Sequence, residues 1–375
     1  MKIIVAAEIF PPDIGGPATY SKKIAEELTK LDWQIKLICY SDKLEKDAYS
    51  YPVWRVLRTK FFLWHYFKYF WQLKKIAKDT SIIYAQGPVS SGWPATLVGK
   101  LLKKKVVVKV VGDYAWEQAR NSGVTSIGID EFQNKKLSGK TKFLKNIETW
   151  VCRSADKVVV PSQYLKKIVL GWGVPENKIK VIYNSIPQPE SITRQEIEGK
   201  DLILSVGRLV SWKGFQTLIE IMPELLMINP NFELVILGDG PEKEKLQTVV
   251  ANLKLETKVR IIKVDANTRD EYLKSAMVFV LNTGYEGLPH TVLEAMAMGT
   301  PVAVSAIGGN PELVEDQKTG LTFRYEDKEQ IKQVILKIYQ DKALAWAMVK
   351  NAKKLLEKFT LENMISQINQ LLKSS

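Results

Sequence analysis

Two glutamates lie eight residues apart in a segment that is typical of a loop running into a helix. Glu286 follows the apolar run 278–281, and Glu294 lies about one turn into the expected helix. With about 3.6 residues per turn, Glu294 points back toward the loop. Two carboxylates so placed suit hydroxyl groups at two positions on one extended ligand. The alternative for Glu294 is an ordinary charge on the helix surface, and that for Glu286 is a loop charge near the helix N-terminus.

Two cations follow a second apolar run, 202–206. Gly207 separates this run from Arg208, and Lys213 comes five residues later, where the next helix is expected to begin. A glycine at a strand end lets a ligand approach the backbone. The forked donors of arginine, the point charge of lysine and the partial charge of a helix N-terminus together favour a diphosphate. A solvated basic loop is the alternative.

Glycines mark two further strand ends. Gly238 and Gly240 precede a proline after the run 232–237, and Gly15 and Gly16 precede an expected helix near the N-terminus. A structural turn explains each pattern nearly as well as a ligand does.

Short apolar runs alternate with longer amphipathic stretches along the whole chain. This alternation predicts parallel sheets covered by helices on both faces, with ligands bound at the carboxyl ends of the strands. The first half is expected to hold strands near 2–7, 34–39, 81–84, 105–110, 157–160 and 178–182, and the second half near 202–206, 232–237, 259–262, 278–281 and 301–304.

The pattern restarts after a polar stretch, 184–199, which contains Pro187, Pro189 and Gly199 and is typical of a linker. With 375 residues, the chain has the length of two domains. We expect an N-terminal domain over 1–185 and a C-terminal domain over 186–359, with the amphipathic helix 360–375 returning to the first.

The segment around the two glutamates has the form E-G-x6-E-A-M-A-x-G-x-P, which matches the E-x7-E motif of retaining glycosyltransferases. Gly15-Gly16, Gly207-Arg208, Lys213-Gly214 and Gly238-x-Gly240-Pro241 precede it in the order found in family 4. The chain therefore resembles a family 4 glycosyltransferase over roughly residues 8–315. The resemblance implies the GT-B fold, an α/β architecture of two Rossmann-like doubly wound domains facing across a cleft.

The resemblance also implies roles for these residues. Arg208 and Lys213 would neutralise the diphosphate of a UDP- or GDP-sugar, Glu294 would bind the ribose hydroxyls, and Glu286 would contact the transferred hexose without acting as a covalent nucleophile. Fixed cations at the leaving phosphate lower the barrier to bond cleavage, so no cofactor and no metal ion are expected. The full expected donor site is Gly15, Gly16, Gly207, Arg208, Lys213, Gly238, Gly240, Val264, Glu286, Gly287, Leu288, Pro289, His290, Thr291 and Glu294.

One position departs from the family. Many members carry a histidine after the strand equivalent to 105–110, whereas this chain has Asp113 there and Glu117 shortly after it. Asp113 either accepts the acceptor's proton or contacts the sugar, or it only caps a loop. We include it with Glu286, Arg208 and Lys213 as a candidate catalytic residue.

The charge is distributed unevenly. Residues 1–199 hold 32 Lys+Arg and 19 Asp+Glu, whereas residues 200–375 hold 22 of each. An aromatic run from Phe61 to Trp71 ends in lysines, and Lys100, Lys103–Lys105 and the 135–145 stretch add further cations. Together these features favour an anionic membrane surface and a lipid-linked saccharide or glycolipid as the hydroxyl acceptor. A buried aromatic helix and a soluble acceptor are the alternatives.

Other protein classes fit less well. No nucleic-acid motif accompanies the basic half, a phosphorylase of the same fold would need a longer chain and a cofactor lysine, and an epimerase would lack these motifs together. Cys39 and Cys152 are expected to be buried free thiols, and neither a metal-ligand spacing nor a signal peptide is found. We expect a cytoplasmic enzyme that binds the membrane surface, and its oligomeric state stays open.

Overall fold

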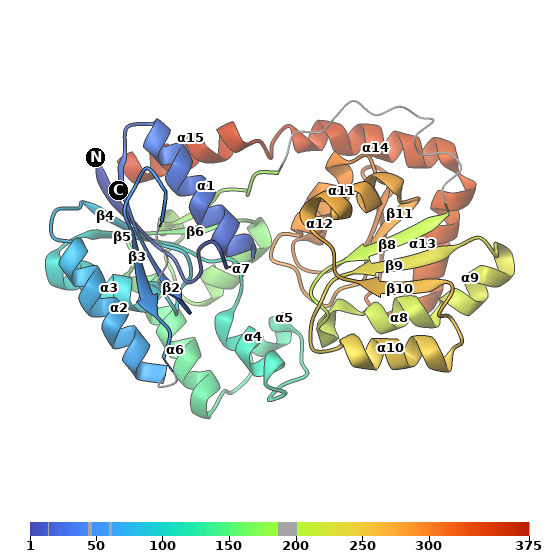
Figure 1. The fold of residues 1–375 in the computed structure, drawn as a ribbon, viewed down its shortest axis with the longest axis horizontal. Coiled ribbons are helices and arrows are strands. Elements are labelled where there is room, and N and C mark those ends of the chain that lie inside the picture. Colours follow the sequence, from blue (N-terminus) through green and yellow to red (C-terminus); the bar gives the residue numbers. More distant parts are fainter. Residues whose placement is uncertain (14, 44–46, 60–61, 187–200, 375) are drawn as a thin grey trace. The chain divides into compact units, whose positions relative to one another are not determined.

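The computed structural model describes residues 1–374 apart from 14, 44–46, 60–61 and 187–200, and it describes no side chains for Phe62 and Leu63. It contains two compact units (Figure 1). Unit 1 comprises Met1–Tyr183 with Glu362–Ser375, and unit 2 comprises Asn184–Leu361. Pro187, Pro189 and Gly199 of the expected linker lie outside the described residues.

Unit 1 is built on a parallel sheet of seven strands in the order β3-β2-β1-β4-β5-β6-β7. The strands are β1 (Lys2–Ala6), β2 (Gln34–Ser41), β3 (Val53–Leu57), β4 (Ile82–Ala85), β5 (Lys105–Lys109), β6 (Lys157–Val160) and β7 (Ile179–Val181). The direction of connection reverses beside β1, because β2 and β3 lie on one side of it and β4 to β7 on the other. Ligands of doubly wound sheets bind at such a reversal.

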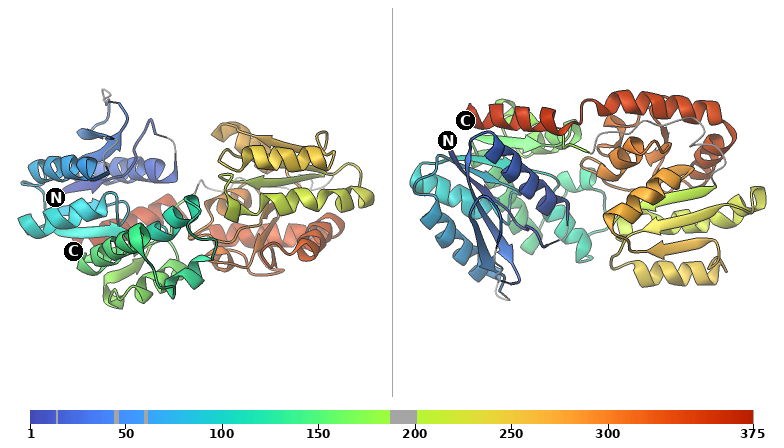
Figure 2. Two further views of the ribbon diagram at one scale, coloured as in Figure 1. Left: turned by 90° about the horizontal axis from the view of Figure 1, so that it is seen from below. Right: turned by 45° about the horizontal axis from the view of Figure 1, so that its top comes forward.

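Helices cover both faces of this sheet (Figures 1 and 2). They are α1 (Gly16–Lys30), α2 (Phe62–Ile76), α3 (Gly92–Leu102), α4 (Tyr114–Asn121), α5 (Ile129–Gln133), α6 (Gly139–Ser154), α7 (Gln163–Gly171) and α15 (Leu361–Lys373). Cys39 on β2 and Cys152 on α6 are buried free thiols, as expected.

Unit 2 repeats the design with six parallel strands in the order β10-β9-β8-β11-β12-β13. The strands are β8 (Leu202–Val206), β9 (Glu233–Leu237), β10 (Val259–Ile262), β11 (Val278–Leu281), β12 (Val302–Ser305) and β13 (Leu321–Phe323). The helices are α8 (Phe215–Glu220), α9 (Met222–Ile228), α10 (Lys243–Asn252), α11 (Ala266–Ser275), α12 (His290–Ala297), α13 (Lys328–Gln340) and α14 (Lys342–Leu356).

The expected α/β architecture with two doubly wound sheets is confirmed, but two strands were missed. β3 pairs only with β2, and it carries Arg55 in its middle, which breaks the apolar run. The Arg55 side chain is nevertheless buried, because it forms an ion pair with Asp47 at 2.6 Å. β13 has only three residues, too few to give a strand pattern.

The last helix, α15, belongs to unit 1 although it follows unit 2 in the chain. Ile368 and Leu372 are fully or almost fully buried, and the Trp33 indole donates a hydrogen bond to Asn369 Oδ1 at 2.9 Å. The amphipathic pattern of this segment therefore reflects packing on the N-terminal unit.

Replacing Ile368 by alanine is expected to lower the free energy of unfolding by about 2–4 kcal/mol, because it leaves a cavity under α15. Gln370→Ala, at an exposed position of the same helix, serves as the control. Chemical unfolding followed by circular dichroism measures both. Equal stability of the two variants would show that α15 does not contribute to the core of unit 1.

Candidate active site

The candidate donor residues of unit 2 gather at one edge of its sheet. The loops that carry them follow β8, β9, β10 and β11, and parallel strands place all of these carboxyl ends on the same side. β8 lies between β9 and β11, so the segments around Gly207, Gly238 and Glu286 are direct neighbours.

An ion pair joins the segment after β8 to the segment after β11. Lys213 ends a short 3-10 helix, Ser211–Lys213, after β8, and its ammonium contacts a carboxylate oxygen of Glu286 in the loop after β11. The exposed fractions of the two side chains are only 15% and 14%. The stem of Lys213 lies beside Gly207, since a Cβ built there would be 3.7 Å from Lys213 Cε. The two charges, 73 residues apart in the chain, thus meet at the end of β8.

The two glycines after β9, Gly238 and Gly240, are required by packing of backbone on backbone. A Cβ on Gly238 would be 2.0 Å from the carbonyl oxygen of Gly207, and one on Gly240 would be 2.5 Å from that of Leu209. Leu209 N–H also donates to Asp239 O at 3.0 Å. These glycines therefore hold the two loops together, which is the turn interpretation that the sequence left open.

Two glycines that the sequence analysis missed support the loop of Glu286. The amide of Gly309 donates to Glu286 O at 2.8 Å. A Cβ on Gly308 would be 2.4 Å from Glu286 O, and a Cβ on Gly309 would be 2.4 Å from Gly287 O. The Gly308-Gly309 dipeptide in the sequence was the available signal.

Buried hydrogen bonds fix the same loop from beneath. Ser305 at the end of β12 donates to Thr283 O at 2.6 Å and accepts from Thr283 N–H at 3.0 Å. Asn310 donates to Ser305 O at 2.7 Å, and Asn282 donates to Gly214 O at 2.9 Å, next to Lys213. Several buried hydrogen bonds that converge on one segment favour a single conformation, so the loop that carries Glu286 is held in place from beneath.

The segment after Glu286 leads into the N-terminus of α12. Leu288 and Pro289 are buried, whereas His290 is exposed and Thr291 half-buried. The first N–H groups of a helix have no partner within it and attract anions. His290 begins α12, and its Nε2 lies 2.7 Å from Asn184 Nδ2.

Glu294 lies on α12 and contacts α11. Its Oε1 is 3.4 Å from Nη1 of Arg269, which also contacts Asp270. Burial raises the pKa of Glu294, while the Arg269 charge opposes that rise. Arg269, like Gly308 and Gly309, was not singled out from the sequence.

Arg208 and Val264 complete the described donor set. Arg208 is exposed, and within the described part of the chain its side chain has no hydrogen bond or ion pair. Val264 is half-buried in the loop between β10 and α11. Both lie at the same sheet edge as Lys213.

The remaining expected residues belong to unit 1. Gly15 is the N-cap of α1, with a φ of 155°, and Gly16 is its first residue. A Cβ on Gly15 would be 3.2 Å from Ile9, whereas Gly16 has no neighbour within 4 Å of such an atom. This is the expected strand-to-helix turn at the carboxyl end of β1.

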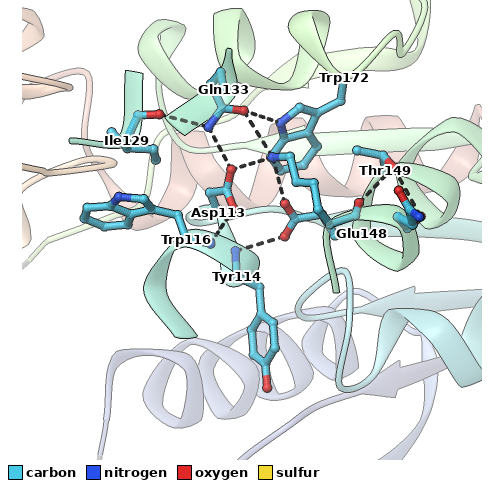
Figure 3. Close-up of polar contacts among 10 residues, drawn as sticks. Asp113, Tyr114, Trp116, Ile129, Gln133, Glu148, Thr149 and Trp172 are labelled. Atoms are coloured by element: carbon cyan, nitrogen blue, oxygen red, sulfur yellow. Dashed lines mark hydrogen bonds and ion pairs between the residues drawn. The ribbon is translucent and has the colours of Figure 1, made fainter. Parts of the chain in front are cut away.

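Asp113 requires a correction. It is the N-cap of α4, its side chain is fully buried, and its Oδ1 accepts from Trp116 N–H at 2.9 Å. Its Oδ2 accepts from Gln133 at 2.8 Å and from the Lys145 ammonium at 2.5 Å (Figure 3). The side chain is buried and both of its oxygens have partners, so Asp113 caps α4, which is the loop-cap alternative that the sequence left open.

A second carboxyl completes this cluster. Glu148 on α6 accepts from Lys145 at 3.0 Å and from the backbone N–H of Tyr114 at 2.9 Å (Figure 3). Burial, and then the adjacent Asp113 carboxylate, raises the pKa of Glu148 well above its ordinary value. One lysine therefore holds together two buried carboxyl groups and the first turn of α4.

The described residues offer no metal site, and a hollow on unit 2 is not formed by the candidate residues. No three His, Cys, Asp or Glu side chains among them are arranged to hold a metal ion. A hollow of about 330 Å³ on unit 2 lies between α8 and α10 and contains none of the candidate residues. Its charged lining is internally paired, since Lys328 contacts Glu220 and Lys245 contacts Glu242.

Two doubly wound units with these motifs at the strand ends define a glycosyltransferase of the GT-B fold. The profile of the family described as "Glycosyltransferase Family 4" matches residues 14–188, and that described as "Glycosyl transferases group 1" matches residues 188–355. The chain therefore belongs to the family 4 glycosyltransferases, whose N-terminal and C-terminal domains these two profiles describe, and it is a glycosyltransferase.

Similar proteins agree with this assignment. An uncharacterised glycosyltransferase of Methanocaldococcus jannaschii is 29% identical over 98% of this chain and 96% of its own length. The lipopolysaccharide core biosynthesis glycosyltransferase LpsE of Rhizobium meliloti is 30% identical over 55% of this chain and 60% of its own. The crystal structure of HepE from Anabaena, in complex with UDP and glucose, superposes with a TM-score of 0.80 at 19% identity, covering 100% of both chains.

Replacing Lys145 by methionine is expected to destabilise the protein by about 3–5 kcal/mol, because it leaves the Asp113 carboxylate buried without its cation. Lys142→Met, at an exposed position of the same helix, is the control. Urea unfolding followed by tryptophan fluorescence compares the two. A loss below about 1 kcal/mol for Lys145→Met would mean that the cluster does not hold α4 in place.

Proposed function

We propose that unit 2 binds a UDP- or GDP-hexose and that the enzyme transfers the hexose, with retention of anomeric configuration, to a hydroxyl acceptor. The meeting of Lys213 and Glu286 at the end of β8 is the observation that carries this proposal. It brings a cation for the diphosphate and a carboxylate for sugar hydroxyls to one place. HepE, a protein of the same fold, has been crystallised with UDP and glucose.

The chemistry follows from these charges. Cleavage of the sugar–phosphate bond leaves its electron pair, and a negative charge, on the diphosphate. Arg208, Lys213 and the first N–H groups of α12 stabilise that charge in advance. The arriving diphosphate competes with Glu286 for the ammonium of Lys213, which frees the Glu286 carboxylate to accept hydrogen bonds from the sugar. Glu294 accepts hydrogen bonds from the ribose.

The acceptor in this proposal is a lipid-linked saccharide or glycolipid of cell-envelope glycan synthesis. Two similar proteins are named for such pathways: LpsE for lipopolysaccharide core biosynthesis, and AmsK of Erwinia amylovora for amylovoran biosynthesis, which is 31% identical over 47% of this chain and 45% of its own. A soluble saccharide acceptor is the alternative.

Peripheral binding to the cytoplasmic face of a membrane is part of the same proposal. No helix of the described residues is long and apolar enough to cross a bilayer. On α2, however, Trp64, Phe67 and Trp71 share one face, and about half of each side chain is exposed. Lys68 lies over the Trp64 ring and Lys74 over the Trp71 ring, so cations border the aromatic stripe. An amphipathic helix of this composition suits an anionic membrane surface.

The donor site is tested by a thermal-shift screen with UDP, GDP and their sugar conjugates. One nucleotide is expected to raise the Tm of the wild type, and Arg208→Ala is expected to bind it roughly 10- to 100-fold more weakly, because it loses a charge-assisted contact. Glu286→Gln is expected to keep nucleotide binding but to lose slow release of the sugar.

Arg324→Ala is the control, since Arg324 is an exposed arginine of the same unit that pairs with Asp327. If no nucleotide stabilises the wild type, or if Arg208→Ala and Arg324→Ala behave alike, the proposed donor site is wrong.

The membrane proposal is tested by co-sedimentation with phosphatidylglycerol vesicles at low salt. The triple change of Trp64, Phe67 and Trp71 to alanine removes on the order of 5 kcal/mol of apolar burial. The bound fraction is therefore expected to fall at least tenfold.

A double change of Met227 and Ile228 to alanine removes exposed apolar side chains from unit 2 and serves as the control. Wild-type protein that remains wholly in the supernatant would disprove membrane binding.

A further inference from the structure

Because Asp113 is buried as the N-cap of α4, other polar groups of unit 1 must contact the acceptor. Four other described carboxylates follow its strands closely at the carboxyl edge: Glu8 and Asp13 after β1, and Asp42 and Asp47 after β2, where Asp47 pairs with Arg55. Asp13 and Asp42 both pair with Arg58, at 2.8 and 3.0 Å. Among the described residues no ion pair within 4 Å involves Glu8, which is half-buried.

Hydroxyl groups from three other elements surround Glu8. Ser90 lies in the segment between β4 and α3, Tyr66 on α2, and Tyr114 begins α4. Helix α2 contacts the end of β1 beside Glu8, where Tyr69 OH donates to Ala7 O at 3.2 Å. The Ser90 hydroxyl lies close enough to Glu8, Tyr66 and Tyr114 to oppose the rise that burial causes in the pKa of each. Ser90 is anchored by its carbonyl, which accepts from Tyr40 OH at 3.0 Å. Strands β1, β4 and β5 are consecutive in the sheet, which is why the segments after them converge.

The buried cluster of Figure 3 positions one member of this group. Glu148 holds the backbone N–H of Tyr114 at 2.9 Å, and Asp113 caps the same helical turn. Figure 3 shows the Tyr114 ring extending away from Asp113 and Glu148. The side chain is therefore fixed from behind, and its hydroxyl lies beside Ser90.

Aromatic rings line the same region. The rings of Tyr40 and Tyr66 are 6.3 Å apart at 74°, and the ring of Trp93 is 5.4 Å from that of Tyr66. Burial raises the pKa of Glu8, with the Ser90 hydrogen bond and the Arg58 charge opposing the rise. Partial burial of the Glu8 carboxylate strengthens the hydrogen bonds that it accepts.

From this arrangement we propose that Glu8, Ser90, Tyr66 and Tyr114 form the subsite of unit 1 that binds the hydroxyl groups of the acceptor saccharide. A sugar offers hydroxyls that both donate and accept, and its C–H faces pack on aromatic rings, so it matches a carboxylate and three hydroxyls among tyrosines and tryptophan. A phosphate group would be repelled by Glu8, and an alkyl chain would leave these polar groups unpaired. The subsite therefore selects the neutral sugar end of an acceptor.

This inference rests on the proposed transferase function, and binding measurements separate the two. Saturation-transfer NMR with octyl glucoside, galactoside, mannoside and N-acetylglucosaminide, below their micelle concentrations, detects saccharide binding to the wild type. At least one of them is expected to bind. Glu8→Gln and Tyr114→Phe are expected to weaken that binding, and to raise the acceptor KM in transfer assays, by at least tenfold. The nucleotide-induced rise in Tm is expected to persist in both.

A half-buried tyrosine and an exposed glutamate of unit 1 provide the controls. Tyr164→Phe removes a tyrosine hydroxyl that bonds to Asp130, and Glu176→Gln removes a carboxylate that pairs with Lys166. Failure of every octyl glycoside to bind the wild type, or variants of Glu8 and Tyr114 that bind and turn over the acceptor as the controls do, would overturn the subsite. A wild type that binds saccharide but no nucleotide would instead overturn the proposed donor.

Discussion

Every strand in both sheets runs parallel to its neighbours, and this constraint determines where functional side chains lie. A parallel sheet sends each chain reversal across a helix, so all carboxyl ends share one edge. In unit 2 that edge brings together Lys213 and Glu286, which are 73 residues apart. In unit 1 it brings Glu8 to Ser90 and Tyr114 in the same way. The site chemistry of each unit is thus a consequence of strand direction and strand order.

The Lys213–Glu286 pair keeps two charges that can bind a ligand at this edge of the sheet. Two largely desolvated charges satisfy each other in the absence of ligand, which avoids the cost of leaving either one buried alone. A donor with a diphosphate and a sugar offers each charge a new partner. Because the backbone of Gly308 and Gly309 and the bonds from Ser305 hold the loop, these partners can exchange without refolding of the site.

The sequence predicted the strands that are buried on both faces and the order of the motifs, because apolar runs and glycine-bounded loops are local signals. It missed β3, where the buried Arg55 depends on a partner eight residues away, and it could not place Glu286 beside Lys213 without the fold. It also could not decide between ligand and packing for Gly238, since the contact that matters is with Gly207 on another strand. For Asp113 the decisive partner, Lys145, is 32 residues further along the chain.

Part of the positive charge of the first half is buried or paired inside unit 1. Lys145 is committed to Asp113 and Glu148, Arg55 is paired with Asp47, and burial lowers the pKa of Lys109 well below its ordinary value. Such cations contribute to the formal charge of +13 but not to the field at the surface. An attraction to an anionic membrane must therefore come from exposed lysines near apolar side chains. On α2 this combination occurs, with Lys74 4.5 Å from the centre of the half-exposed Trp71 ring, so the local pattern is a stronger argument than the net charge.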